Sequence, residues 1–445
     1  MSDPIEEAAL SGGTAAEIAL SVEGAISAGR LAAGARLPTV RELAARLAVS
    51  PATVNAAYRT LRNRGLVAAA GRAGTRVLER TAPTNRALGA PVGPGVRDLA
   101  DGNPDPALLP QLRPALAKLS GRQWLYGESG ALPALLDWFR VDFGRDGLAA
   151  EHLAVAGGAM DAIERVLQAH LWPGDAVIVE DPAFGGVLDL VSALGLRPIA
   201  VPVDDDGLRA DLLRRALEQR PAACVLTPRA QNPTGAALSP QRAAELRKAF
   251  QHRENVLLIE DDHAAAVAGT EPETVGGKGE FRHWAVIRSV TKYLGPDLRL
   301  SVVSGDQLTV DRVLRRQQVG AGWASRLLQE LAVTLLLDPA TPKLLATARE
   351  TYRERRRVLA DALGRRGIAL SGRSGFNGWI PTPAEGAVAQ ALLARGWAVR
   401  TGEAFRTNVP PGLRVTFANL SPAEAEDFAA TLHSILQGDG RGYPA

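Results

Sequence analysis

Apolar side chains recur at helical spacing in the first part of the chain. Ile18, Val22 and Ile26 fall on one face of a predicted helix. A second helix is expected over residues 40–47. The segment Thr39-Val-Arg-Glu42 at its start has the spacing of a capping box, in which a hydroxyl and a carboxylate each bind a backbone N–H group. The chain therefore begins with short amphipathic helices.

A third helix is predicted after a short turn. Ser50-Pro51 offers an N-cap hydroxyl and a proline at the first helical position, and the helix is expected to end at about Asn63. The segments 66–70 and 75–78 flank a glycine-containing turn and indicate a small hairpin, or wing. Two short helices joined by a tight turn and followed by this hairpin predict an α+β winged helix-turn-helix domain.

The pattern changes at about residue 80. Residues 80–97 are rich in Thr, Ala, Pro and Gly without periodicity, which is typical of a linker. Short apolar runs then alternate with helical segments, which predicts an α/β domain with a mostly parallel sheet covered by helices. The chain is thus expected to be multidomain, with a helix-turn-helix domain (1–79), a linker (80–97), a large domain (98–350) and a smaller C-terminal α+β domain (351–440).

Five predicted strands of the large domain end in polar or glycine-rich residues. In open α/β sheets, ligands bind beyond the carboxyl ends of the strands. We therefore expect one ligand site built from all five ends. These are Gly157-Gly158-Ala159, Glu180-Asp-Pro-Ala-Phe184, Pro228-Arg-Ala-Gln-Asn232, Glu260-Asp-Asp-His263 and Ser289-Val-Thr-Lys292.

Lys292 is unusual, because burying an ammonium at the end of an apolar strand is costly. It is one of only five lysines in a chain whose positive charge comes mainly from arginine. A desolvated amine there can form a Schiff base with an aldehyde, and Arg299 offers a planar fork for a phosphate. Aldehyde and phosphate together suggest pyridoxal 5'-phosphate (PLP). A loop lysine and a loop arginine in solvent are the alternative for this stretch alone.

The other strand ends supply the remaining groups that PLP needs. Asp261 would keep the pyridine nitrogen protonated, Phe184 would stack on the ring, and Asn232 would bind the phenolic oxygen. Gly158-Ala159, at a helix start, would bind the phosphate together with Arg299. Each residue has a plain alternative as core aromatic, N-cap or turn. Five separate strand ends are unlikely to imitate one site by chance.

Charge is distributed unevenly, although the net charge is only +3. Residues 21–78 contain nine Arg, no Lys and two acids, a net charge of +7, so the rest of the chain must carry −4. A basic N-terminal domain favours a polyanionic partner such as double-stranded DNA. A small helical bundle with a solvated arginine face is the alternative.

In a helix-turn-helix, the second helix of the pair enters the major groove. Thr53 and Asn55, in its first turn, are expected at base edges. Arg41, Arg46 and Arg72 are expected to bind backbone phosphates.

Composition sets limits on the class of protein. An apolar fraction of 46% and a charged fraction of 22% are typical of a soluble globular chain. No apolar stretch is long enough to span a membrane, and the acidic start lacks the apolar core of a signal peptide. The single Cys224 excludes an internal disulfide and fits a reducing compartment. We expect a cytoplasmic protein without a metal site.

Both halves of the chain resemble known families. Leu37-Pro-Thr-Val-Arg-Glu, Val49-Ser-Pro-Ala-Thr-Val and Gly65-Leu-Val resemble the GntR family of winged-helix bacterial regulators. From about Asp98 the chain resembles the fold-type I PLP enzymes of the aspartate aminotransferase class, most specifically in Asn232-Pro-Thr-Gly235. This combination is the plan of the MocR/GabR subfamily. Within that subfamily the motifs are most similar to the PtsJ-type regulators of vitamin B6 salvage.

The resemblance implies further roles. Arg414 would bind a ligand carboxylate, Tyr126 would reach a phosphate in the other subunit of a homodimer, and Ser289 and His263 would belong to the cofactor site. His263 stands where the family usually has Tyr, and Ala159-Met160 replaces polar phosphate-binding residues. The similarity to the PtsJ-type regulators implies that PLP itself is the signal, and the departures imply weak phosphate binding and inefficient transamination. We therefore expect no catalytic residue.

We interpret the chain as a homodimeric, PLP-responsive transcriptional regulator of vitamin B6 metabolism that binds operator DNA. One alternative is an active aminotransferase with an appended DNA-binding domain, which Arg414 favours. Another is a regulator that senses an amino acid through PLP. A third is a regulator whose aminotransferase-like domain has lost PLP and serves only for dimerisation. The presence of Lys292, Asp261 and Asn232 argues against this alternative.

Overall fold

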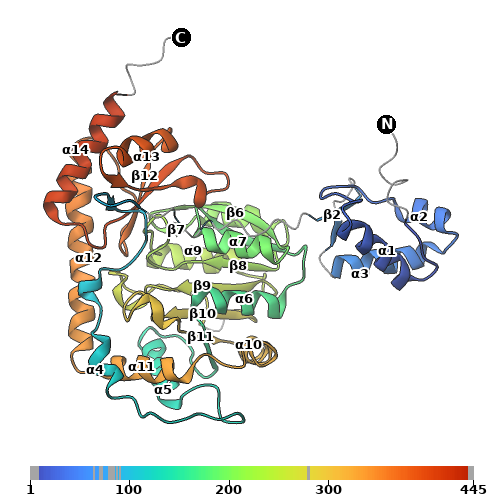
Figure 1. Cartoon of the computed structure of the whole chain (residues 1–445), viewed down its shortest axis with the longest axis horizontal. Helices are drawn as coiled ribbons and strands as arrows, with labels where there is room; N and C mark the ends of the chain where they lie inside the picture. The colour runs from blue at the N-terminus through green and yellow to red at the C-terminus, as the bar shows by residue number, and fades with distance from the viewer. Residues whose placement is uncertain are drawn as a thin grey trace. The chain divides into compact units, whose positions relative to one another are not determined.

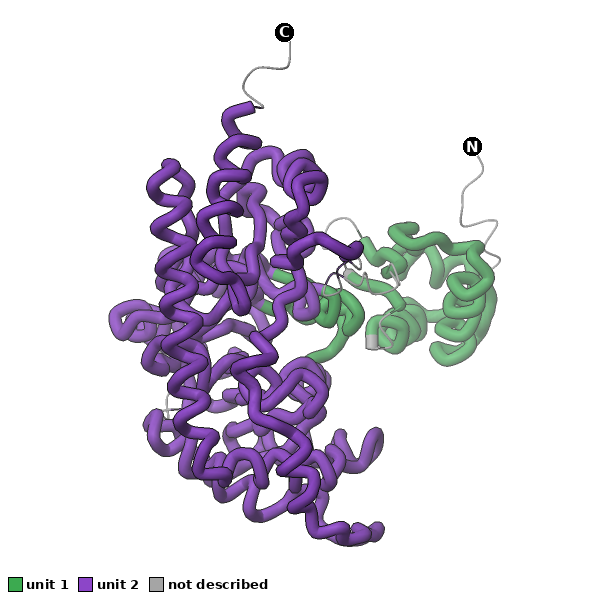
Figure 2. The backbone as a smooth tube through the Cα atoms, turned by 60° about the vertical axis from the view of Figure 1, so that its left-hand side comes forward, with its two compact units in different colours: residues 1–84, 171–177, 189–198 green, residues 85–170, 178–188, 199–445 purple. Residues whose placement is uncertain are grey.

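A computed structural model describes most of the chain: residues 10–63, 66–69, 74–78, 86, 89, 92–277 and 281–438. Two compact units are distinguished (Figure 2). One consists of residues 1–84, 171–177 and 189–198, and the other of residues 85–170, 178–188 and 199–445.

The N-terminal domain contains the predicted helices and hairpin (Figure 1). Its elements are α1 (Ala15–Ser27), α2 (Val40–Leu47), α3 (Pro51–Asn63), β1 (Val67–Ala69) and β2 (Thr75–Val77), with β1 and β2 antiparallel. The expected bounds of α2 and its capping box are confirmed: Thr39 Oγ1 accepts from the Glu42 N–H, and Glu42 Oε2 accepts from the Thr39 N–H. The predicted N-cap of α3 is also present, since Ser50 Oγ accepts from the Thr53 N–H at 3.1 Å.

One apolar core joins the helices of this domain. The predicted inward residues Ile18 and Val22 of α1 are fully buried beside Val54 and Tyr58 of α3. The Tyr58 hydroxyl donates to the Pro38 carbonyl at 2.8 Å, which fixes α3 against the segment that precedes α2. The helix-turn-helix is therefore held by both apolar packing and a buried hydrogen bond.

The large domain is built on one mixed sheet. In the described part of the chain the sheet has eight strands in the order β4-β11-β10-β9-β8-β5-β6-β7. Strands β8, β9 and β10 are parallel, whereas β11 is antiparallel to β10 and β4. The predicted mostly parallel core is confirmed, with antiparallel strands added. The bounds are β4 (Leu153–Ala156), β5 (Ala176–Asp181), β6 (Arg197–Asp204), β7 (Gly207–Leu208), β8 (Ala223–Leu226), β9 (Leu257–Asp262), β10 (Trp284–Ser289) and β11 (Ser301–Gly305).

Helices surround this sheet, as the burial of its strands other than the partly exposed β6 requires (Figure 1). Helix α6 packs against β4, β9, β10 and β11, and its first turn follows directly on the carboxyl end of β4. The helices are α4 (Leu112–Leu116), α5 (Pro133–Arg145), α6 (Ala159–His170), α7 (Gly185–Ala193), α8 (Ala210–Leu217), α9 (Pro240–Phe250), α10 (Gln307–Val319), α11 (Arg326–Leu336) and α12 (Thr341–Gly364). Short 3₁₀ helices are η2 (Pro106–Leu108), η3 (Ala265–Val267) and η4 (Pro296–Leu298).

The long helix α12 leads into a smaller C-terminal domain. Its antiparallel sheet has the order β12-β15-β14, and α14 packs against α12 and α13. A separate parallel pair joins β13 to β3, the strand that precedes the large domain in sequence. The elements are β3 (Arg97–Asp98), β12 (Asn377–Pro381), α13 (Glu385–Leu393), β13 (Trp397–Ala398), β14 (Arg400–Thr401), η5 (Gly402–Ala404), β15 (Gly412–Thr416) and α14 (Pro422–Gly438).

None of the helices found in the described residues has the length and apolar character needed to cross a membrane.

Candidate cofactor site and candidate nucleic-acid interface

A cavity of about 450 Å³ lies at the carboxyl ends of the strands of the large domain. All five predicted strand ends contribute to its wall. The predicted cofactor residues on the wall are Ala159, Phe184, Asn232, Asp261, His263, Lys292 and Arg299. Glu180, Thr227 and Thr291 also line it.

Lys292 lies in this cavity, where its Nζ donates to the Gly102 carbonyl at 2.9 Å. Desolvation, helped by the positive charge of Arg414, lowers the pKa of the amine to about 8. A larger fraction of the side chain is therefore neutral near physiological pH than for an exposed lysine, which favours attack on an aldehyde.

Unpaired buried atoms face the cavity on the side of β9. Oδ1 of Asp261 and Oδ1 of Asn232 are buried and have no hydrogen-bond partner among the described residues. His263 Nδ1 is likewise unpaired and lies 3.6 Å from Asp261 Oδ2. Leaving such atoms unsatisfied costs about 1–3 kcal/mol each, so their convergence indicates a polar ligand. A protonated pyridine nitrogen would donate to Asp261 Oδ1, and a phenolic hydroxyl would donate to Asn232 Oδ1.

Another part of the cavity wall is suited to an anion. The wall residues Ala159 and Met160 are in the first turn of α6, where backbone N–H groups have no partner within the helix. Gly158 has a φ of +101°, and a Cβ added there would lie 2.9 Å from Nη2 of Arg299. Only glycine at this position lets the guanidinium approach the start of the helix. A helix N-terminus beside an arginine fits a phosphate dianion.

A network that the sequence did not reveal holds the Asn232 loop. Gln231 Nε2 donates to Glu180 Oε2 at 3.1 Å and to the Pro182 carbonyl at 2.7 Å, and Gln231 Oε1 accepts from Thr234. Complete burial raises the pKa of Glu180 to about 7. The sequence places Glu180 and Gln231 at two strand ends but does not reveal that they bind each other, because the ends belong to separate strands, β5 and β8.

Gly235 closes the same loop. Its φ is +74°, and a Cβ there would lie 2.4 Å from the Asn377 carbonyl of the C-terminal domain. The Asn-Pro-Thr-Gly segment therefore requires its glycine for close approach of the backbone.

Arg414 lies next to Lys292 without lining the same cavity. It is buried, its Nη2 donates to the Ala100 carbonyl, and its guanidinium stacks over Phe405 at 5.1 Å. A Cβ added at Gly102 would lie 3.1 Å from Nη1 of Arg414, so the chain at Gly102 separates the two cations. Burial, with the charge of Arg400, lowers the pKa of Arg414 to about 10. No carboxylate of the described residues pairs with it, which suits the predicted ligand carboxylate.

Three predicted cofactor residues, Gly158, Ser289 and Tyr126, do not line the cavity wall. Ser289 is buried on β10, with its hydroxyl 2.9 Å from Thr291 Oγ1 and bonded to the Leu300 carbonyl. Tyr126 is 92% exposed and stacks edge-on against Trp323. A contact of Tyr126 with a second subunit remains a prediction.

The predicted DNA-binding residues lie on and beside the helix pair. Arg41, Arg46 and Asn55 are exposed, as a DNA contact requires. Thr53 is half-buried, and its hydroxyl lies 2.8 Å from that of Ser50, so it contributes to the start of α3. Arg72 lies outside the described residues. In the described part of the chain, no cluster of His, Cys, Asp or Glu side chains is arranged to hold a metal ion.

Comparison with protein families assigns both parts of the chain. Residues 14–77 match the family of bacterial regulatory proteins, gntR family, and residues 98–432 match the family aminotransferase class I and II.

Relatives of known name share this arrangement. The vitamin B6 salvage pathway transcriptional repressor PtsJ of Salmonella typhimurium is 42% identical over 430 residues, which cover 96% of this chain and 99% of that protein. The HTH-type transcriptional regulator TauR of Rhodobacter capsulatus is 27% identical over 93% of this chain and 94% of its own.

Solved structures confirm the fold of the body. The kynurenine aminotransferase of Pyrococcus horikoshii superposes with a TM-score of 0.72 at 20% identity, covering 78% of this chain and 92% of that chain. The α-aminoadipate aminotransferase LysN of Thermus thermophilus gives a TM-score of 0.69 at 22% identity, covering 78% and 93%. At these identities the likeness concerns the fold alone.

Proposed function

The chain is a GntR-type transcriptional regulator whose body belongs to the aminotransferase class I and II family, and we propose that PLP is the ligand to which it responds. The observation that carries the proposal is the convergence of unpaired Asp261 and Asn232 atoms on the cavity that contains Lys292. The two acceptor oxygens are complementary to the protonated ring nitrogen and phenolic hydroxyl of PLP, and the Lys292 amine is complementary to its aldehyde.

Each residue of the cavity then has a definite task. PLP, when bound, supplies an aldehyde for covalent attachment and a ring that can withdraw electrons. Lys292 provides the amine, Asp261 holds a proton on the ring nitrogen, and Arg299 binds the phosphate. Ala159 and Met160 offer backbone N–H groups but no side-chain donor. The grip on the phosphate therefore depends on Arg299 and the helix start.

Vitamin B6 metabolism is the proposed field of regulation. PtsJ, which covers almost the whole chain, is a repressor of a vitamin B6 salvage pathway. In a regulator of that pathway, PLP would serve as a reversibly bound effector and not as the cofactor for transamination of an amino acid. We propose that the DNA contacts of the N-terminal domain are made by Arg41, Arg46, Thr53, Asn55 and Arg72, and that the working unit is a homodimer in the cytoplasm.

Covalent capture tests the cofactor assignment. Borohydride reduction of the full chain with PLP should add one phosphopyridoxyl group, located at Lys292 by peptide mass spectrometry. Lys292→Ala should abolish the adduct, whereas the exposed Lys343→Ala should leave it unchanged. An adduct of equal yield in Lys292→Ala would refute the assignment.

A specific observation also favours a second function, transamination. Arg414 is a buried guanidinium without a described carboxylate partner, beside the lysine. Rapid multiple-turnover conversion of an amino acid and a keto acid, lost in Arg414→Gln, would support it. We expect only slow turnover, because His263 and Ala159 depart from the enzyme pattern.

A further inference from the structure

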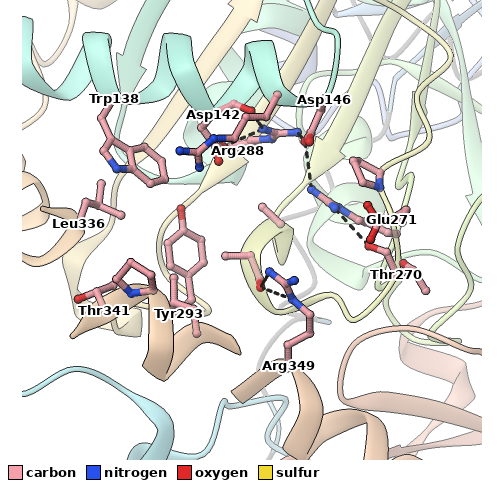
Figure 3. A pocket seen from close by; sticks show the side chains of 17 residues that line it. Trp138, Asp142, Asp146, Thr270, Glu271, Arg288, Tyr293, Leu336, Thr341 and Arg349 are labelled. Carbon is pink, nitrogen blue, oxygen red and sulfur yellow. Dashed lines mark hydrogen bonds and ion pairs between the residues drawn. The ribbon is translucent and has the colours of Figure 1, made fainter. Parts of the chain in front are cut away.

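A second cavity, of about 400 Å³, shares no wall residue with the cofactor cavity (Figure 3). One face of α5, one face of α12 and the segments after β8 and β9 surround it. Its volume is in the range of small-molecule sites.

Neighbouring residues of the chain face the two cavities. Lys292 lines the cofactor cavity, and the next residue, Tyr293, lines the second. On β9, Asp261 lines the cofactor cavity, whereas Asp262 binds Arg229 and Arg288, which line the second. Alternation along a strand places successive side chains on opposite faces of the sheet.

An ion-pair network forms the floor of the second cavity. Asp262 binds Arg229 through two hydrogen bonds of 2.8 Å and binds Arg288 at 3.0 Å. Arg288 also binds Asp142 at 2.8 Å, and it binds Asp146. Three carboxylates thus face two guanidinia, with one negative charge in excess. The carboxylates of Asp142 and Asp146 are 25% and 19% exposed, and in each the Oδ1 atom has no described partner.

Tyr293 adds an unpaired hydroxyl to this floor. The residue is only 2% exposed, and no hydrogen bond joins its hydroxyl to any described residue. Figure 3 shows the ring pointing into the cavity, between Trp138 and Asp142. A hydroxyl at the cavity wall can accept a hydrogen bond from a ligand, and aromatic faces beside carboxylates are suited to an organic ammonium.

Two arginines and one carboxylate, that of Glu271, are exposed at the mouth of the cavity, so the mouth carries a net positive charge. Arg349, exposed on α12, donates only to the Ala266 carbonyl, at 3.1 and 3.2 Å. Arg145, exposed at the end of α5, forms no ion pair with any described carboxylate. Both guanidinia line the cavity and are available to an anion.

We propose that the second cavity is a binding site for a small zwitterion, a free amino acid with an apolar or aromatic side chain. The ammonium binds Asp142, Asp146 and the Tyr293 hydroxyl, the carboxylate binds Arg349, and the apolar part packs on Trp138. This site does not depend on whether PLP binds at Lys292.

Three probes separate the two charges. L-phenylalanine carries both, phenethylamine lacks the carboxylate, and 3-phenylpropionate lacks the ammonium. Calorimetric titrations are made on two forms of the full chain. In one form PLP has been fixed by borohydride and occupies the cofactor cavity; the other form is the apo protein without PLP. L-phenylalanine should bind both forms at least about tenfold more tightly than either fragment, because each fragment loses a charged hydrogen bond.

Variants locate the site. Ala266→Trp should fill the cavity and abolish binding of L-phenylalanine. Arg349→Gln should weaken L-phenylalanine and 3-phenylpropionate but leave phenethylamine unchanged. Arg353→Gln is the matched control, because Arg353 is exposed one turn further along α12, pairs with Glu350 and does not line the cavity.

The outcomes are decisive in both directions. The proposal is overturned by undetectable binding of L-phenylalanine and L-leucine at millimolar concentration, by equal affinity for the three probes, or by L-phenylalanine affinity unchanged in both Ala266→Trp and Arg349→Gln. If the wild-type protein captured no PLP on reduction but still bound L-phenylalanine, the cofactor assignment would be overturned and the proposal for this second cavity would stand.

Discussion

Asp261 and Asp262 are adjacent acids on β9 with opposite surroundings. Asp261 has an unpaired oxygen at the cofactor cavity, whereas Asp262 is enclosed by Arg229 and Arg288. Burial alone would raise the pKa of Asp262, but the charges of the two arginines outweigh burial and hold its pKa well below the usual range. Its stabilising contribution is therefore present above about pH 4 and is lost as the pH falls through the folded-state value.

The two acids should respond oppositely to the same substitution. Asp262→Asn removes one partner of a buried pair, so the free energy of unfolding of the apo protein should fall by about 3–5 kcal/mol. Asp261→Asn should change it by less than about 1 kcal/mol but weaken PLP binding. Urea unfolding and PLP titration measure the two effects. Equal losses of stability in both variants would contradict the distinction.

The pH dependence of PLP capture is a second test at this scale. The neutral amine attacks, and desolvation lowers the pKa of Lys292 to about 8. The initial rate of capture should rise roughly tenfold for each pH unit below that value and level off above it, whereas an exposed lysine would continue to gain up to about pH 10.4. Arg414→Gln removes a repelling charge, so its profile should move to higher pH. A wild-type rate still rising at pH 10 would disprove the lowered pKa.

The cofactor-site residues that could be predicted from the sequence are those that stand in a recognisable local pattern. Lys292, Asp261 and Asn232 each follow an apolar run, and the structure brings all three to one cavity. Tyr293 and Gln231 stand beside them without such a pattern. Gln231 matters because of its hydrogen-bond partners on other elements, and Tyr293 because it lines a cavity formed by several elements. The hydrophobic periodicity of the sequence gives no information on either.

Among the elements, helix α3 has the most direct functional consequence. We expect its exposed Asn55 to contact a base edge and the exposed Arg41 of α2 to contact a backbone phosphate. Asn55→Ala should reduce the ratio of operator to random-sequence affinity, and Arg41→Ala should lower both affinities by a similar factor and reduce the salt slope by about 1. Electrophoretic titrations at several salt concentrations measure both. An unchanged ratio in Asn55→Ala would remove it from the base contacts.

Helix bounds were more predictable than strand neighbours. The hydrogen bonds that cap α2 and α3 join residues no more than four positions apart in the sequence. Both helices begin where the sequence predicts. The same capping spacing at Thr14 and Glu17 opens α1. Nothing local places β11 between β4 and β10, because strand order is decided by long-range pairing.

For the whole molecule, a regulator requires that PLP bind two conformations with different affinity. Such coupling is typically about 1–3 kcal/mol, so operator affinity should differ roughly 5- to 150-fold between apo and PLP-bound protein. Operator DNA must then change PLP affinity by the same factor. DNA titrations with and without PLP, and PLP titrations with and without operator, measure both. Equal operator affinity of the two forms would exclude PLP as the switch of DNA affinity.

The pairing of β3 with β13 has a consequence for biosynthesis. Arg97, in β3, binds Glu424 of α14 at 2.7 Å, a partner 327 residues further along the chain. Domains fold largely in the order of their synthesis, so the winged helix can fold while most of the body is still unmade. Strand β3, which follows the linker, can bind Glu424 only after helix α14 has left the ribosome. A message cut short before codon 397 would therefore yield a DNA-binding domain that lacks this anchor.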